Sequence, residues 1–387
     1  MKVVLSTIGK FHTFDLAREL HAQGALESIF SGYPSIKLRA ERLPANRIHS
    51  FPWLHAPYMA LRPQRRLGVW LTQLWEYLDR VSFDRYVSRR MPNCDVFVGL
   101  SGSALESGLA ARVQGAKYVC DRGSSHIRAQ EQLLREEHEL WDFSYAGIDP
   151  RIIGREEAEY AAADCITVPS TFARESFISK GVAPGKVRRI PYGVNLDKFQ
   201  SVAAPSAGHF DVLFVGGMTL RKGVQYLLKA YAALQHPKKS LTLAGAPDPH
   251  FIDQMKRRNL WPADVQLLGH VSQQRLKEVM SRSHALVLAS IEEGLAMVQA
   301  QAMACGCPVI GTDNTGAADL YEDGKEGFIV PIRQPELIAA RLQALADSAP
   351  LQEQMSKASL ARVAHLGGWS TYGLEALKTY QSLLATS

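Results

Sequence analysis

The sequence predicts an α/β protein of two domains, each built around a parallel sheet with helices on both faces. The chain has 387 residues, more than a single hydrophobic core usually serves. Short apolar runs alternate with helical stretches in both halves, which is the pattern of a doubly wound sheet. The segment 200–209, rich in alanine, proline, serine and glycine, separates the halves and is expected to be the linker.

In the first half, an apolar strand is expected at Val3–Thr7, followed by a glycine turn at Gly9. An amphipathic helix is expected from about Thr13 to Gln23. Further apolar runs that predict strands lie at Asp95–Leu100, Lys117–Cys120 and Cys165–Pro169.

The second half repeats this alternation more regularly. Strands are expected at Val212–Val215, Leu241–Gly245, Val265–Leu268, Ala285–Ala289, Pro308–Gly311 and Gly327–Val330. Helices are expected at Val224–Leu234, Pro249–Arg258, Gln273–Ser281, Met297–Cys305 and Pro335–Ala346. Parallel sheets of this kind bind ligands at the carboxyl ends of their strands.

The composition is that of a soluble globular enzyme, with 46% apolar and 21% charged residues. No apolar run approaches the ~20 residues of a membrane span, and the first residues do not resemble a signal peptide. The chain is therefore expected in the cytoplasm. The cysteines are expected to be free, buried residues in a reducing compartment, and Cys305-Gly-Cys307 alone is weak grounds for a metal site. They are Cys94, Cys120, Cys165, Cys305 and Cys307.

The net charge of +6 is concentrated in one segment. Residues 37–90 hold eleven Lys or Arg and four Asp or Glu, a local charge of +7, together with several tryptophans and tyrosines. This favours an anionic partner, either a membrane surface or an acidic acceptor. No nucleic-acid-binding motif accompanies the charge, so nucleic acid is not expected.

Within this segment, apolar residues follow helical spacing. They are Leu67, Trp70, Leu71, Leu74, Leu78 and Val81. Arginines lie close by at Arg62, Arg65, Arg66, Arg80, Arg85, Arg89 and Arg90. One interpretation is an amphipathic helix packed on the N-terminal core, and the other is peripheral attachment to anionic lipid.

Two clusters in the second half follow strands and carry groups suited to a phosphorylated sugar. The loop Val215–Gly223 combines glycines with Arg221 and Lys222, which can neutralise a diphosphate. After a later strand, Glu293 precedes a glycine and a helix that begins near Met297. The free N–H groups of that helix start favour an anion, and a carboxylate can accept hydrogen bonds from sugar hydroxyls. A third turn, Asp313–Ala317, follows the next strand and is more typical of a plain loop.

These residues together resemble the donor domain of the retaining family-four glycosyltransferases. The resemblance rests on Glu293-Gly-Leu-Ala-Met-Val, the run from Gln301 to Ile310, Lys222-Gly223, and Ile190 to Phe199. It covers about Glu156 to Leu345 well and the first strand and helix weakly. It implies the GT-B arrangement, in which two Rossmann-like domains face a cleft and a C-terminal helix crosses back to the N-terminal domain.

The resemblance also implies domain bounds and residue roles. An acceptor-side domain is expected at 1–199, the linker at 200–209, the donor domain at 210–365 and the crossover helix at 366–387. Glu293 would hold hydroxyls of the donor sugar, and Lys222 the diphosphate. Backbone groups would face the sugar at Leu295 and Ala296, and the phosphate and ribose at Met297 and Val298.

Two positions depart from the family pattern. The second glutamate of the EX7E motif, which would bind the ribose, is Gln301, and an amide can still form that hydrogen bond. The usual arginine after the first glycine of the loop is Gly217, which leaves Arg221 as its substitute. We interpret both changes as variation within the family.

In the N-terminal half the resemblance is weaker. Gly9 matches the glycine loop that approaches the donor phosphates. The family often places a histidine after the strand that here ends near Cys120, and the nearest candidates are Asp121 and His126. His126 could instead be only a helix-start residue.

The resulting hypothesis is retaining, metal-independent transfer from a UDP- or GDP-sugar to a glycan, lipid-linked or small-molecule hydroxyl. No cofactor or metal is expected, and Arg221, Lys222 and the helix start would stabilise the departing diphosphate. By the same resemblance, retention would come from attack on the sugar face that the phosphate leaves. Two alternatives remain open: a sugar-nucleotide epimerase or phosphorylase of the same fold, and a non-catalytic sugar-nucleotide-binding protein.

Overall fold

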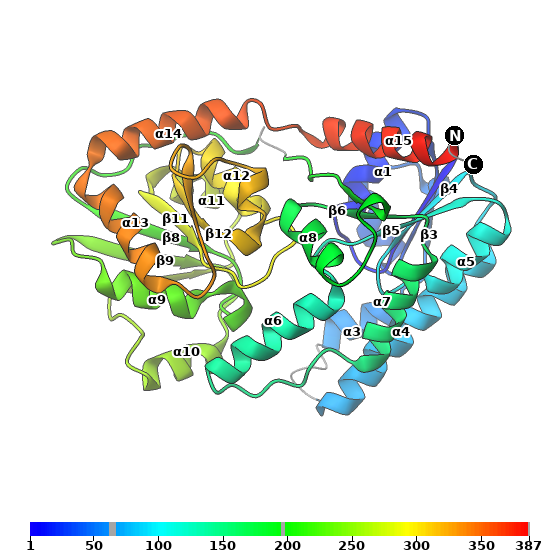
Figure 1. The fold of residues 1–387 in the computed structure, drawn as a ribbon, viewed down its shortest axis with the longest axis horizontal. Coiled ribbons are helices and arrows are strands. Elements are labelled where there is room, and N and C mark those ends of the chain that lie inside the picture. Colours follow the sequence, from blue (N-terminus) through cyan, green and yellow to red (C-terminus); the bar gives the residue numbers. More distant parts are fainter. Residues whose placement is uncertain (62–66, 195–197, 386–387) are drawn as a thin grey trace.

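The computed structural model describes residues 1–61, 67–194 and 198–385 and contains two α/β domains side by side (Figure 1). Each domain has one parallel sheet flanked by helices, as the sequence predicted. The strands are short and mostly buried because helices cover both faces of each sheet. The linker expected at 200–209 is irregular and leads into the first strand of the second sheet.

The N-terminal sheet has the strand order β3-β2-β1-β4-β5-β6-β7. Its strands are β1 (Val3–Thr7), β2 (Leu26–Ser31), β3 (Ile48–Ser50), β4 (Val96–Leu100), β5 (Lys117–Asp121), β6 (Cys165–Val168) and β7 (Val187–Arg189). Its helices are α1 (Thr13–Ala22), α2 (Ser35–Leu38), α3 (His55–Leu61), α4 (Val69–Arg90), α5 (Leu105–Val113), α6 (Ile127–Leu140), α7 (Pro150–Ala162) and α8 (Thr171–Ser179). The order reverses between β1 and β4, and ligands of such sheets bind at this point.

The C-terminal sheet has the order β10-β9-β8-β11-β12-β13 and reverses between β8 and β11. Its strands are β8 (Phe210–Val215), β9 (Lys239–Ala244), β10 (Val265–Gly269), β11 (Ala285–Leu288), β12 (Val309–Thr312) and β13 (Gly327–Val330). Its helices are α9 (Val224–Ala233), α10 (Pro249–Arg257), α11 (Gln273–Arg282), α12 (Met297–Ala304), α13 (Pro335–Asp347) and α14 (Ala349–Val363). Every strand and helix expected in this half is present within two residues.

The last helix, α15 (Trp369–Ala385), returns from the C-terminal domain to the N-terminal domain (Figure 1). Tyr372, Ala376 and Tyr380 are buried in the core that contains Leu16 and Leu20 of α1. Leu374 of the same helix is exposed. The crossover helix that the resemblance implied is confirmed.

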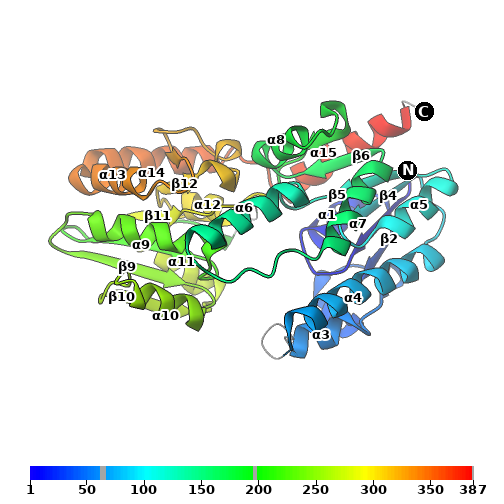
Figure 2. The same cartoon turned by 60° about the horizontal axis from the view of Figure 1, so that its bottom comes forward.

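One helix of the N-terminal domain also reaches the other domain. Helix α6 lies between the two bodies in Figure 2, and Trp141, directly after it, is buried in the C-terminal core. The Trp141 indole donates a hydrogen bond to the Tyr226 hydroxyl at 3.1 Å. The Glu137 carboxylate is fully buried and pairs with Arg333 at 2.8 Å. These contacts hold the domains together on this side of the cleft.

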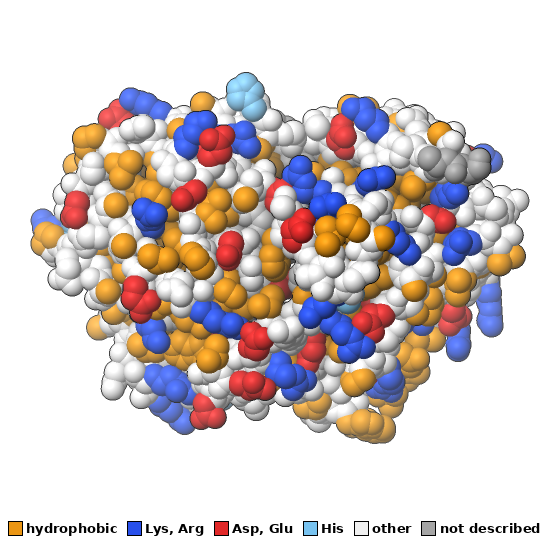
Figure 3. Space-filling view, viewed as in Figure 1, with side chains coloured by type: hydrophobic (Ala, Val, Ile, Leu, Met, Phe, Trp, Pro, Cys, Tyr) orange, Lys and Arg blue, Asp and Glu red, His pale blue; other side chains and the backbone are white. Residues whose placement is uncertain are grey.

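Helix α4 packs on the N-terminal core through Phe83 and Val87 in its second half, but most of the apolar stripe predicted in its first half faces outward. Val81 is buried, but Leu67, Trp70, Leu71 and Leu78 are exposed. Arg62, Arg65 and Arg66 lie outside the described residues. In Figure 2, α3 and α4 form one edge of the domain, and in Figure 3 apolar side chains gather at the lower right, where Figure 1 places these helices. No helix in the described ranges combines the length and apolarity needed to cross a bilayer.

Candidate active site

A cavity of about 490 Å³ opens between the domains, at the carboxyl ends of β1, β4 and β5 and the start of α12. Its apolar lining consists of Ile8, Phe11, Leu100, Leu295, Met297 and Trp369. Its charged lining consists of Asp15, Arg80, Arg122 and Glu156, and His12, Ser101 and Tyr192 add polar groups. An apolar cavity with a few converging polar groups at a strand-order reversal is typical of a small-molecule site.

His12, at the start of α1, presents a polar group to this cavity. Its Nε2 lies 2.5 Å from Oδ2 of Asp121, and its ring lies 4.2 Å from that of Tyr192. The Asp121 carboxylate is buried at the end of β5, and its other oxygen accepts a hydrogen bond from Thr167 Oγ1 at 2.8 Å. Asp121 therefore does not line the cavity itself but fixes the orientation of His12.

The glycine turn before His12 is tightly packed. The Gly9 carbonyl accepts hydrogen bonds from Thr7 Oγ1 at 3.3 Å and from Ser31 Oγ at 3.4 Å. A side chain at Gly9 would collide with the ring of Phe11, which is half-exposed and lines the cavity. Glycine at this position thus leaves room for the Phe11 ring to lie over the backbone of the turn.

His126 does not reach the cavity. It is the N-cap of α6, where its ring accepts a hydrogen bond from the Arg128 N–H at 3.2 Å. The ring packs against Tyr160 and Phe177, with centroids 5.1 and 5.0 Å away. Burial lowers the pKa of His126 to about 4. The structure therefore gives His126 the helix-start position that the sequence left open.

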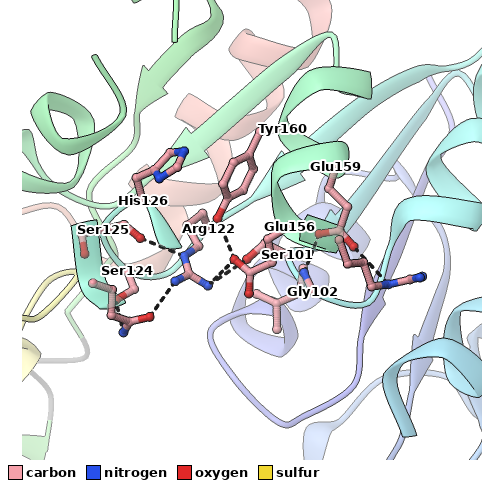
Figure 4. A network of polar contacts seen from close by, with 12 residues as sticks. Ser101, Gly102, Arg122, Ser124, Ser125, His126, Glu156, Glu159 and Tyr160 are labelled. Carbon is pink, nitrogen blue, oxygen red and sulfur yellow. Dashed lines mark hydrogen bonds and ion pairs between the residues drawn. The ribbon is translucent and has the colours of Figure 1, made fainter. Parts of the chain in front are cut away.

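Arg122, which follows Asp121, connects several groups in and around the lining of the cavity. The Arg122 guanidinium is buried and pairs with Glu156 at 2.8 Å (Figure 4). It also donates hydrogen bonds to the Ser125 carbonyl at 3.0 Å, to Ser101 Oγ at 3.2 Å and to Gln130 at 2.9 Å. Five donors in a fixed fork allow one arginine to hold all of these groups. Arg122 is thereby fixed in place.

A second glutamate lies one helical turn further along α7. Glu159 is fully buried and accepts the N–H groups of Gly102 and Ala104 (Figure 4). Burial, with the neighbouring Glu156 charge, raises the pKa of Glu159 to about 8. Burial thus favours the neutral form of Glu159, and Glu156 is the carboxyl group of this pair that contacts Arg122.

On the C-terminal side, a short 3₁₀ helix, η6 (Leu220–Lys222), presents the two basic residues predicted to face a diphosphate. Lys222 forms an ion pair with Glu293, and Arg221 Nη1 lies 3.6 Å from the same carboxylate. Gly223 ends η6 with φ +68°, and a side chain there would collide with the Ala289 carbonyl. Glycine thus lets η6 approach the loop after β11, where Glu293 lies.

Glu292, which the sequence reasoning passed over, joins the two domains. It belongs to the C-terminal domain, but its buried Oε1 accepts hydrogen bonds from Ser125 N at 3.1 Å and Ser125 Oγ at 2.8 Å, and from Ser124 Oγ. Although burial opposes it, Arg221 and these serine contacts keep the pKa of Glu292 below its usual range. The carboxylate stays charged and holds the β5–α6 loop against the donor-side loops.

The start of α12 offers unpaired backbone donors beside the cavity. The Ala296 N–H is used, since it donates to the Thr315 carbonyl at 3.0 Å. Within the described ranges, no hydrogen bond is found for the N–H groups of Leu295, Met297 or Val298. Leu295 and Met297 also line the cavity. The sequence assigns the N–H groups of this helix start to an anion, and that assignment stays a prediction.

The two positions that depart from the family pattern, Gln301 and Gly217, make few contacts with the described residues around them. The Gln301 amide is half-buried, and no partner for it is found in the described part of the chain. A Cβ at Gly217 would meet nothing within 4 Å. Neither residue has a packing role that would explain its identity.

The structure thus brings together Glu293, Lys222 and Arg221, and places Leu295 and Met297 against the β1 loop. Asp121 is separated from the cavity by His12, and His126 does not reach the cavity. The residues missed from the sequence are Phe11, His12, Arg80, Arg122, Glu156 and Glu292. Of these residues, only Glu292 and His12 could have been found from the sequence, because Glu292 directly precedes Glu293 and His12 follows the Gly9 turn.

Among the described residues, no group of three or more His, Cys, Asp or Glu side chains is arranged to hold a metal ion. The five cysteines are free, and burial raises the pKa of Cys305 to about 11. The Cys305–Cys307 pair lies in the core of the C-terminal domain.

Family models match almost the whole chain. Residues 10–198 match the model described as Glycosyltransferase Family 4, and residues 197–362 match Glycosyl transferases group 1. The two matches meet where the N-terminal domain ends.

Curated relatives are similar at lower coverage. Alpha-D-kanosaminyltransferase of Streptomyces kanamyceticus is 26% identical over 342 residues, which are 83% of each chain. A D-inositol 3-phosphate glycosyltransferase of Streptomyces avermitilis is 29% identical over 243 residues, which are 57% of this chain and 52% of that protein. The chain spans about half the length of several of the curated relatives that it matches.

Solved structures show the same fold. Sucrose-phosphate synthase of Thermosynechococcus elongatus superposes with a TM-score of 0.75 at 22% identity, over 100% of both chains. Anabaena Alr3699/HepE in complex with UDP-glucose superposes with a TM-score of 0.69 at 16% identity, over 99% of this chain and 100% of that one. The expected arrangement of two domains around a cleft is confirmed.

Proposed function

Because this chain consists of a Glycosyltransferase Family 4 domain followed by a Glycosyl transferases group 1 domain, we propose that it is a glycosyltransferase that uses a nucleoside diphosphate sugar. The observation that carries the proposal is the set of cations and free N–H groups beside the cavity: Arg221, Lys222 and the start of α12. The bound UDP-glucose of the HepE structure is of the same donor class. UDP- and GDP-sugars are the donors to test first.

Transfer requires the stabilisation of a departing diphosphate and of an oxocarbenium-like sugar. We propose that Lys222 and Arg221 receive the diphosphate with the help of the Met297 and Val298 N–H groups. Preorganised donors of this kind each lower a barrier by about 3 kcal/mol. We propose further that no metal ion is needed, because the protein supplies the positive charge. A chelator should then leave activity unchanged.

On the other side of the cavity, we propose that His12 contacts the reacting sugar or the attacking hydroxyl. Asp121 is a positioning residue in this scheme, since it reaches the substrate only through His12. Among the described residues that line the cavity, each carboxylate has a basic partner, because Asp15 pairs with Arg18 and Glu156 with Arg122. This favours retention by attack on the face that the phosphate leaves, in which the phosphate takes the proton of the acceptor.

One experiment separates this function from its alternatives. The protein is incubated with a panel of UDP- and GDP-sugars, with and without EDTA, and the release of free nucleoside diphosphate is measured. A transferase releases the diphosphate through slow hydrolysis or transfer. An epimerase changes the sugar and leaves the nucleotide attached, and a phosphorylase needs added phosphate or sugar phosphate. A binding protein shows none of these reactions, and that result would contradict the proposal.

We also propose that the acceptor is a glycan or lipid-linked sugar and that the protein attaches to the inner face of an anionic membrane. The support is the exposed apolar side of α4 together with the turn just before α3, where Trp70 and Trp53 are 67% and 73% exposed. Arg85 and Arg89 continue the same side of α4 toward its end and are exposed. Apolar and basic groups on one face are typical of an interfacial helix.

A further inference from the structure

Arg80 differs from the other charged residues of the cavity because no ion pair or hydrogen bond links it to any residue that the structure describes. Arg122 makes four polar contacts, but within residues 1–61, 67–194 and 198–385 no hydrogen bond or ion pair of Arg80 is found. The Arg80 guanidinium lies against Gly102, where a side chain would collide with it. Glycine at 102 therefore makes room for an arginine that contacts no acid.

The acids of the cavity lining are already balanced by other arginines. Asp15 forms an ion pair with Arg18, and Glu156 pairs with Arg122 at 2.8 Å. This leaves Arg80 as the cation of the described lining that forms no ion pair, although Glu156, which is already paired with Arg122, lies on the other side of the same Gly102 position. A half-buried cation in an apolar cavity loses hydration, and an anion bound there would compensate for it.

The position of Arg80 indicates which of the two substrates, donor or acceptor, would carry an anion bound to it. Arg80 lies on α4 in the N-terminal domain, beside Ser101 and Glu156, whereas the cations proposed for the donor diphosphate, Arg221 and Lys222, lie on the C-terminal domain. We propose that Arg80 binds an anionic group, a phosphate or carboxylate, carried by the acceptor. This inference rests on the proposed function. The planar guanidinium matches either anion with two parallel hydrogen bonds.

Helix α4 also connects this group to the surface. Trp70 is exposed on the apolar side ten residues before Arg80, which is about 15 Å along a helix. An acceptor whose phosphate is joined to a lipid would therefore have its charge near the cavity and its chain near the exposed face. A soluble sugar phosphate would offer Arg80 the same chemistry.

The test compares matched acceptors on the full-length protein, once a donor has been identified. One pair is inositol and inositol phosphate, a second is methyl glucoside and methyl glucuronide, and a third arm is a sugar linked to a short polyprenyl phosphate in mixed micelles. The variants are Arg80→Gln, Arg80→Lys and, as a control, Arg257→Gln on the exposed face of α10. The expected result is a rise of about 10-fold or more in KM for anionic acceptors in Arg80→Gln, because a charge-assisted contact is lost. The KM for neutral acceptors should change less than twofold, and Arg257→Gln should behave as wild type.

Arg80→Lys keeps the charge but loses the fork, so its KM for anionic acceptors should be intermediate. It also serves as the second variant if Arg80→Gln does not fold. Better use of the polyprenyl phosphate than of the soluble phosphate would identify a lipid source, and equal use a soluble one. Equal losses for anionic and neutral acceptors, or none, would overturn this inference alone. Absence of any turnover of sugar nucleotides by the wild type would instead overturn the proposed function, and this inference with it.

Discussion

Lys222 and Glu293 form an ion pair with each other, although they were expected to hold different parts of the donor. Lys222 lies in η6 and Glu293 in the loop after β11, 71 residues later. A diphosphate that binds Lys222 must compete with the Glu293 carboxylate. Binding would release that carboxylate to accept hydrogen bonds from sugar hydroxyls, so the two groups should act together.

The variant Lys222→Ala is expected to weaken binding of UDP or GDP by about 10-fold or more, because a charge-assisted contact to phosphate is lost. Binding of uridine or guanosine should change little, since neither carries phosphate. Titration calorimetry with the four ligands measures the difference. Lys238→Ala, at an exposed site of the same domain, is the control. Equal losses for nucleotides and nucleosides would indicate a folding role for Lys222.

Glu293→Gln is expected to reduce turnover by about 100-fold or more, the usual effect of removing one positioned polar group from such a site. The amide keeps the shape of the side chain but loses the charge that pairs with Lys222. Release of nucleoside diphosphate gives the rate, and Glu322→Gln, an exposed residue paired with Lys325 at 3.5 Å, is the control. Near wild-type turnover would show that Glu293 does not hold the sugar.

Gln301→Glu is expected to be tolerated, with turnover within about threefold of wild type. The Gln301 side chain is half-buried and has no partner among the described residues, so a carboxylate there breaks no existing contact. A charged acceptor also forms the stronger hydrogen bond with a ribose hydroxyl. Thermal unfolding serves as the folding control. An inactive but folded variant would contradict the assignment of Gln301 to the ribose.

The C-terminal half was predictable because its signals are local. Each of its strands is a short apolar run followed by polar or glycine residues, and the structure places all six within two residues of expectation. Part of its site is also contiguous in sequence, with Glu293, Met297 and Gln301 on one loop and helix, whereas Arg221 and Lys222 reach Glu293 because β8 and β11 are neighbours. Contiguous residues at the end of one strand need no knowledge of strand order.

The N-terminal half was less predictable because its strands are short and its site is assembled from distant segments. Strands β3 and β7 have three residues each, too few for a periodic pattern. His12, Arg80 and Arg122 meet only because β1, β4 and β5 are neighbours and α4 packs beside them. His126 was a candidate because the resemblance implied a histidine after β5. The start of α6 turns this side chain away from the cavity.

The low pKa of His126 has a consequence for stability. The folded protein keeps this ring neutral down to about pH 4, because burial excludes the charged form, whereas the unfolded chain protonates it near pH 6.5. The contribution to stability is therefore complete above pH 6.5 and is lost as the pH falls toward 4. Between pH 7 and 4.5, this effect should lower the free energy of unfolding of the wild type by on the order of 2 kcal/mol. We expect His126→Asn, which retains an N-cap residue, not to show this decrease.

Urea unfolding of wild type and variant across this pH range measures the difference in slope. His270→Asn is the matched control, because His270 is exposed. Parallel curves for wild type and His126→Asn would contradict the assignment of this pH dependence to His126. Glycosyl transfer at pH 7 in the same variant tests whether His126 has any part in the reaction.

The exposed side of α3 and α4 predicts salt-dependent binding to lipid. We expect the protein to sediment with vesicles that contain an anionic lipid at low salt, and less with neutral phosphatidylcholine or at high salt. Each arginine near such a surface contributes about 1 kcal/mol, so Arg89→Gln with Arg90→Gln should weaken binding about 30-fold. Trp70→Ser with Leu71→Ser should weaken it further, because the apolar anchors that enter the headgroup region are removed.

The control for apolar loss is Val113→Ser, which removes a side chain that is 89% exposed on α5, outside this face. It should leave sedimentation unchanged. If wild type binds anionic and neutral vesicles equally at low salt, the arginines of α4 do not act on a membrane. Membrane attachment would then be wrong, and the exposed side of α4 together with Arg80 would have to be explained by a soluble acidic acceptor, because the charge of residues 37–90 would still lack a partner.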